Sequence, residues 1–100
     1  MAETNLSYEA IATKLIKANV LKYWQNFAKA VYDYLEKEWL VEGYNKPNII
    51  QISESARHVF YNNKSIKYVM SVLSDKETTF LIVNFIHILD KQFNEKINNN

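Results

Sequence analysis

The sequence contains no cysteine, one glycine and one proline among its 100 residues. Without cysteine the chain has no disulfide framework and no thiolate metal site. A single glycine cannot supply the glycine-rich loops that hold nucleotide phosphates. Scarce glycine and proline also argue against an all-β fold, which needs many tight turns. The composition therefore favours a helical protein without nucleotide or thiolate chemistry.

Arginine is nearly absent as well, because Arg57 is the only one among the 12 basic residues. The formal net charge is +1. A protein that mainly coats nucleic acid is usually more basic. Any nucleic-acid contact is therefore expected on a limited face rather than over the whole surface.

The remaining composition is that of one globular domain spanning residues 1–100, with 48% hydrophobic and 14% aromatic residues. We expect residues 1–6 and 98–100 to fray. Residues 1–5 lack the basic and apolar regions of a signal peptide, and no membrane span is evident. The expected location is cytoplasmic, away from membranes.

The most apolar stretch is Phe80–Leu89, in which eight of ten residues are apolar. Ser74 and Glu77 precede it with the spacing of a capping box, which predicts a helix from about residue 75 to 96. The stretch is too short to span a bilayer, which takes roughly 20 residues. We therefore expect an all-α, compact bundle of four to five helices around this C-terminal helix, with Phe85 and Ile86 in the core.

The N-terminal half shows two apolar stripes at helical spacing. The first comprises Tyr8, Ile11, Ala12 and Leu15, and the second Ile16, Val20, Trp24, Phe27, Val31 and Leu35. The stripes lie roughly 150° apart at about 100° per residue. This predicts a break at residues 17–19, with Asn19 capping a second helix of about residues 20–41. One continuous helix with a partner on each side remains the alternative.

Gly43 and Pro47 mark a turn between the two halves. A helix is predicted from about residue 48 to 61, with an apolar face of Ile49, Ile52, Ala56, Val59 and Phe60. A short strand at residues 49–52 is the alternative. After Asn62 and Asn63, a helix of about residues 64–73 is expected to bury Ile66, Val69, Met70 and Leu73.

The sequence offers little for catalysis. Glu54 and His58 could form half of a metal site, but further ligands at suitable spacing are absent. Ser53 and Ser55 lie near His58 without the glycine-rich elbow of a hydrolase. We expect no enzyme activity, no metal and no cofactor.

Residues 48–73 have the outline of a helix-turn-helix, although Phe60 stands where a small residue is usual. No acidic residue occurs between Arg57 and Ser74, which favours this segment over Lys22 and Lys29 as a phosphate-binding region. The predicted nucleic-acid-binding residues are Arg57, Lys64, Lys67, Tyr68 and Ser71.

Four other residues are predicted to bind a protein partner. Trp39 precedes the central turn and Tyr44 lies within it, and exposed aromatic residues are enriched in interfaces. Phe80 and Val83 fall beside the main stripe of the C-terminal helix and could form an apolar contact patch.

These features favour a non-catalytic helical binding subunit of a larger assembly, with a nucleoprotein complex as the preferred interpretation. Its partners would be proteins or further copies of the chain, with nucleic acid as an additional ligand. The alternatives are a helix-turn-helix DNA-binding regulator and a small viral or phage protein that blocks a host protein.

Overall fold

The computed structural model describes residues 6–40 and 47–98. The chain forms helices α1 (Tyr8–Lys17), α2 (Leu21–Leu35), η1 (Glu36–Leu40), α3 (Ile49–Asn62), α4 (Ile66–Met70) and α5 (Asp75–Asn98). The described residues contain no strand. The predicted all-α bundle is confirmed, and the strand alternative for residues 49–52 is wrong because these residues lie in α3.

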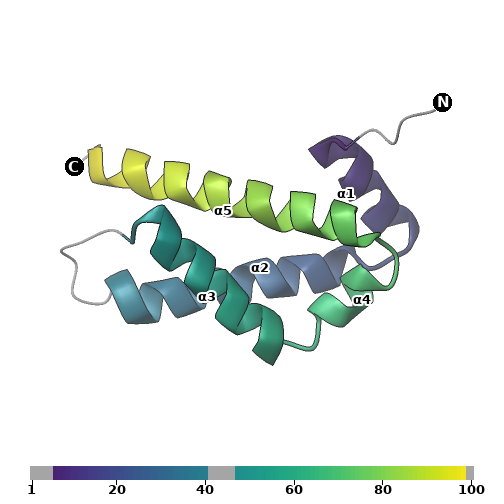
Figure 1. Ribbon diagram of the computed structural model, residues 1–100, viewed down its shortest axis with the longest axis horizontal. Helices are drawn as coiled ribbons and strands as arrows, with labels where there is room; N and C mark the ends of the chain where they lie inside the picture. The colour runs from purple at the N-terminus through teal and green to yellow at the C-terminus, as the bar shows by residue number, and fades with distance from the viewer. Residues whose placement is uncertain (1–5, 41–46, 99–100) are drawn as a thin grey trace.

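Figure 1 shows α5 running along the length of one side of the molecule. Helices α2 and α3 lie against each other beneath it, and α3 also contacts α5. Helices α1 and α4 both lie at the end of the molecule where α5 begins. Each helix covers one apolar face against its neighbours, which is how a bundle excludes water from its core.

Helix α2 contributes a stripe of four buried side chains to the core. Trp24, Phe27, Val31 and Leu35 recur at helical spacing, and each is at most 5% exposed. The Phe27 ring contacts Phe60 of α3 edge-on at 6.5 Å between centroids, and the Trp24 ring contacts Phe85 of α5 at 5.4 Å. Aromatic contacts thus join α2 to both of its long neighbours.

The apolar stretch of α5 is less buried than its composition suggests. Leu81 and Leu89 are buried, whereas Val83 and Ile88 are 42% and 41% exposed. Phe85 and Ile86, expected in the core, are only partly buried and pack against it. A helix with apolar residues on several faces cannot turn all of them toward one core, so part of the stretch remains at the surface.

The predicted break between the first two helices is confirmed, because α1 ends at Lys17 and α2 begins at Leu21. The prediction that Asn19 caps the second helix is wrong, because Val20 is the N-cap of α2. Asn19 instead belongs to the turn that terminates α1, where it adopts φ 62°. The Asn19 N–H donates to the Ile16 carbonyl and the Val20 N–H to the Leu15 carbonyl. This pair of bonds is a Schellman ending, which favours a left-handed residue such as asparagine.

The second predicted stripe does not extend back into α1. Ile16, which was assigned to the second stripe, is 61% exposed. The second helix also ends earlier than expected, at Leu35, and continues as the five-residue π-helix η1. The predicted turn at Gly43 and the fraying of residues 1–5 and 99–100 lie outside the described residues.

Helix α3 matches its predicted range, and Asn48 and Gln51 form a capping box at its start. Helix α4 is shorter than the predicted range of 64–73. Ile66, Val69 and Leu73 are buried as predicted, but Met70 is 40% exposed. The helix ends at Met70, so α4 buries only a narrow stripe and this side chain lies on its flank.

The predicted capping box at the start of α5 is present. The Glu77 N–H donates to the Ser74 hydroxyl at 3.1 Å, and the Ser74 N–H donates to the Glu77 carboxylate at 2.9 Å. The same carboxylate also accepts a hydrogen bond from the Lys14 ammonium. This ion pair joins a half-exposed lysine of α1 to a buried carboxylate in the first turn of α5.

Candidate binding faces

Five residues of α2 and of the α4 region form the first candidate face, which we call the tyrosine–lysine face: Lys22, Tyr23, Lys64, Lys67 and Tyr68. The Tyr23 and Tyr68 rings stack with centroids 4.3 Å apart and an interplanar angle of 22°. The Lys22 ammonium lies 5.3 Å from the centroid of the Tyr23 ring. The stack places a lysine of α2 near the predicted basic segment, an arrangement that sequence reasoning did not identify.

The turn before α4 is fixed to α2 by a small polar cluster. The Asn26 side-chain oxygen accepts hydrogen bonds from the Asn63 amide at 3.2 Å and from the Ser65 hydroxyl at 2.9 Å. The Ser65 N–H in turn donates to the Asn63 side-chain oxygen at 2.8 Å. These bonds hold the chain that carries Lys64 against α2 and so support the position of the tyrosine–lysine face.

The other predicted nucleic-acid-binding residues fit this face less well. Ser71 is exposed, but its hydroxyl donates to the Tyr68 carbonyl at 2.7 Å, so its proton is already used. Arg57 is exposed on α3, and no hydrogen bond or ion pair among the described residues joins its side chain to α4. Lys64, Lys67 and Tyr68 therefore remain candidates for this face. The Ser71 hydroxyl proton is not available to a ligand, and Arg57 is not linked to the other three residues.

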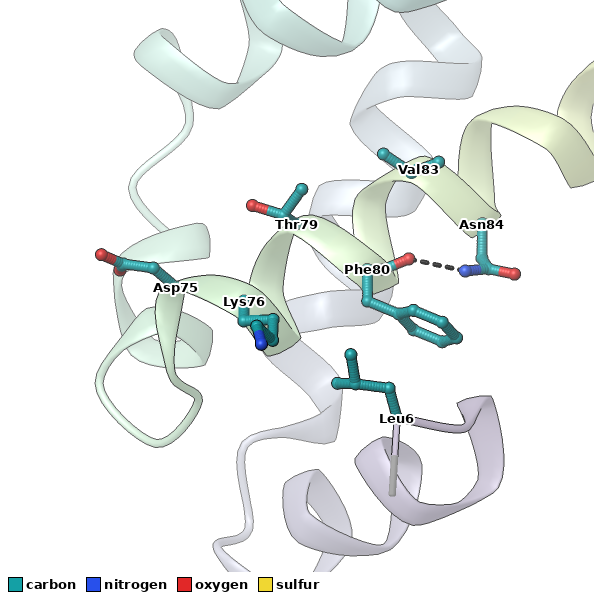
Figure 2. Close-up of a pocket in the computed structure, with 7 residues that line it drawn as sticks. All are labelled: Leu6, Asp75, Lys76, Thr79, Phe80, Val83 and Asn84. Carbon is teal, nitrogen blue, oxygen red and sulfur yellow. Dashed lines mark hydrogen bonds between the residues drawn. The ribbon is translucent and has the colours of Figure 1, made fainter. Parts of the chain in front are cut away.

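Phe80 and Val83 line an open depression of about 630 Å³ between the first turns of α5 and Leu6, shown in Figure 2. Leu6 and Phe80 point toward one another there, and the Asn84 amide donates to the Phe80 carbonyl at 2.8 Å. Phe80 is partly buried against the core, whereas Val83 is 42% exposed. The depression is mostly apolar, and it has no group arranged for a particular ligand.

Trp39, the third predicted partner-binding residue, is 37% exposed and lines a smaller pocket between η1 and α3. The pocket, which we call the acidic notch, is lined by Tyr34, Glu38, Trp39, Gln51, Glu54 and Ser55. Tyr44, the remaining predicted partner-binding residue, lies outside the described residues.

The structure provides little support for metal chemistry at Glu54 and His58. Within residues 6–40 and 47–98, no group of three or more histidine and acidic residues could hold a metal ion. The His58 ring instead stacks on Tyr34 with centroids 4.5 Å apart. Half of a metal site is thus not completed by any described neighbour.

One carboxyl group has a clearly altered acidity. The hydrogen bond from Lys14 lowers the pKa of Glu77 below its ordinary value of 4.5, and the Ser74 N–H contributes in the same direction. Burial opposes this effect, because it disfavours the charged form. Glu77 is buried at the contact between α1 and α5 and lines none of the candidate sites, so its role is structural.

Comparison of the chain with protein-family models, with curated proteins and with solved structures finds no match. Among the helices that the structure describes, none has the length and apolar character needed to cross a membrane.

Proposed function

We propose that this chain is a non-catalytic helical subunit of a nucleoprotein assembly and contacts nucleic acid through the tyrosine–lysine face. The observation that carries the proposal is the Tyr23–Tyr68 stack, with Lys22 over the Tyr23 ring. Two exposed lysines, Lys64 and Lys67, lie within four residues of Tyr68 in the sequence. Proteins that bind single-stranded nucleic acid combine aromatic platforms for bases with cations for the backbone.

The aromatic part of this combination is accessible. Tyr68 is 52% exposed although one side of its ring is covered by Tyr23. A base can stack on an aromatic ring whatever its identity, and each such contact is worth about 1–3 kcal/mol. The face therefore suits contact without strong sequence preference.

The charged part is also available. Lys64 and Lys67 are exposed, and neither forms an ion pair with a described residue. By contrast, Lys14 and Lys29 are paired with Glu77 and Asp33. Free ammonium groups next to an aromatic ring can neutralise phosphates and release counterions, which makes binding depend on salt.

The length of α4 favours single strands over duplex as the ligand. A helix-turn-helix regulator places its second helix in the major groove. Helix α4 has five residues, fewer than two turns at 3.6 residues per turn. It is too short to lie along the major groove as a recognition helix. We therefore infer that the tyrosine–lysine face contacts unpaired bases.

The test is fluorescence anisotropy with a labelled oligothymidine and a labelled duplex over a series of salt concentrations. The parent should bind the single strand more tightly than the duplex. Tyr68→Ala should weaken binding by about 1–3 kcal/mol. The double change Lys64→Gln and Lys67→Gln should flatten the log–log salt dependence by about 0.7 for each phosphate that the variant no longer neutralises.

Lys29→Gln is the matched control, because this lysine lies on α2 but is paired with Asp33. It should leave affinity and salt dependence unchanged, and all variants should keep the parent melting temperature. Tighter binding to one duplex sequence would favour the DNA-binding regulator instead. Absence of binding at low salt would overturn the nucleic-acid role and leave protein binding alone.

A further inference from the structure

The acidic notch lies on different residues from the tyrosine–lysine face and has different chemistry. Tyr34 comes from the end of α2, Glu38 and Trp39 from η1, and the other three lining residues from α3. Its volume is about 90 Å³. This equals about three water molecules at ~30 Å³ each, so the notch has room for the head of one side chain rather than for a large ligand.

The π-helical turn explains why a tryptophan lines this notch. Leu35 is fully buried, and residues four apart share a face in an α-helix. A continuing α-helix would therefore carry Trp39 over Leu35 into the core. The wider turn of η1 rotates the following residues, and Trp39 instead stands 37% exposed beside the notch.

The notch carries only negative charge. It is lined by two carboxylates, Glu38 and Glu54, and by no lysine or arginine. Neither carboxylate has an ion-pair partner among the residues that the structure describes. The Gln51 side-chain oxygen is already used, since it accepts the Asn48 N–H in the capping box. The unpaired negative charge favours a positively charged ligand.

Ser55 provides an observation that does not depend on the two carboxylates. This residue is 3% exposed, yet it lines the notch. Its hydroxyl has no hydrogen bond with any described residue, whereas the nearby Ser53 hydroxyl donates to the Ile49 carbonyl. The hydroxyl oxygen is not fully enclosed, because among the described residues only the Thr78 hydroxyl is both enclosed and without a partner. The Ser55 hydroxyl is thus available to a ligand in the notch.

We propose that the acidic notch binds one arginine side chain from a basic segment of a partner protein. A guanidinium group is planar, stacks on aromatic rings, and offers five N–H donors in a fixed arrangement. Trp39 supplies the ring, and Glu38, Glu54 and Ser55 supply acceptors. This inference is independent of the nucleic-acid proposal, because it involves none of the residues of the tyrosine–lysine face.

The test is an NMR titration of the whole chain with N-acetyl-arginine methylamide at constant ionic strength. The chain has two tryptophans, and Trp24 is 5% exposed in the core. Its indole N–H signal is therefore an internal control for the Trp39 signal. We expect a saturable shift of the Trp39 signal alone, and at least fivefold weaker binding of the lysine and citrulline derivatives.

Variants then locate the binding site. Glu38→Gln and Glu54→Gln should each weaken arginine binding severalfold, and the two together should abolish it. Glu36→Gln is the matched control, because Glu36 is exposed on η1 but does not line the notch. Circular dichroism checks that each variant remains folded.

Three results would overturn the inference. The first is the absence of a saturable shift with the arginine derivative. The second is binding of the citrulline or lysine derivative as tight as that of arginine, and the third is an equal loss of affinity in Glu36→Gln and in the notch variants. Oligothymidine binding measured on the same variants separates this outcome from the nucleic-acid proposal. Glu38→Gln and Glu54→Gln should leave the affinity for oligothymidine unchanged.

Discussion

Helices α2 and α5 meet through the Trp24–Phe85 and Tyr32–Phe93 ring contacts, but they distribute their apolar residues differently. Helix α2 separates a fully buried stripe from a polar outer face, where Lys29 and Asp33 form an exposed ion pair. Helix α5 has the more apolar central stretch and leaves Val83 and Ile88 at the surface. Burial follows the regularity of the stripe rather than the number of apolar residues.

The two helices also begin in different ways. Helix α5 starts with side-chain bonds between Ser74 and Glu77, reinforced by Lys14. Helix α2 has no side-chain hydrogen bond at its N-cap, Val20. Its direction is set by the preceding turn, in which Asn19 adopts φ 62°. We therefore expect α2 to be sensitive to core and backbone changes and α5 to be sensitive to charge changes at its first turn.

The largest predicted difference is between two phenylalanines. Phe27→Ala should cost about 3–5 kcal/mol of unfolding free energy, because Phe27 is fully buried in α2. Phe85→Ala should cost clearly less, because this ring is only partly buried. Urea unfolding measures both, with Val83→Ala as the surface control in α5. Equal effects for the two phenylalanines would show that α5 contributes as much to the core as α2.

The next prediction concerns the backbone turn before α2. Asn19→Pro should destabilise the chain by about 3 kcal/mol, because proline cannot adopt a positive φ and lacks the N–H that donates to Ile16. Asn19→Gly, which fits a positive φ, should preserve or slightly raise stability. Thermal melting of both variants checks the pair. A melting temperature for Asn19→Pro equal to that of the parent would contradict the Schellman ending.

The features that were predicted correctly depend on residues close together in the sequence. The break before α2 follows from two apolar stripes, and the start of α5 follows from Ser74 with Glu77 three residues on. Each of these signals lies within one or two helical turns. The helical spacing likewise identified the stripe of α2.

The missed features depend on packing between distant segments. Lys14 and Glu77 are 63 positions apart, and Asn26 lies 39 positions from Ser65. The Tyr23–Tyr68 stack also depends on how α4 lies against α2. A helical wheel describes one helix at a time, so it can place Lys22 and Tyr68 on outer faces without showing that the faces meet. The π-helical turn that exposes Trp39 has no residue signal in the sequence.

The third prediction tests the charged start of α5. Glu77→Gln should cost about 1–3 kcal/mol near neutral pH, because it removes the charge but keeps an acceptor for the Ser74 N–H. The pKa of Glu77 is lowered in the folded chain, so its charge stabilises the fold above the unfolded pKa. This contribution should disappear as the pH falls below 4.5 and through the folded pKa.

The measurement is urea unfolding of parent and Glu77→Gln at several pH values, in which the two curves should converge in acid. Asp33→Asn is the control, because it removes an ion pair that is exposed on α2. It should change the unfolding free energy by less than about 1 kcal/mol. A difference between parent and Glu77→Gln that persists unchanged in acid would show that shape rather than charge makes Glu77 important.

The smallest predicted effect lies one residue further along α5. Thr78 is 6% exposed, and its hydroxyl has no hydrogen-bond partner among the described residues. A buried hydroxyl without a partner costs free energy relative to a methyl group of the same shape. Thr78→Val should therefore raise the unfolding free energy by about 1 kcal/mol. Thr79→Val, at the exposed neighbouring position, should change it little. A lower stability in Thr78→Val would mean that the hydroxyl has a partner in solution. A higher stability would show that the Thr78 hydroxyl adds no favourable contact at the start of α5.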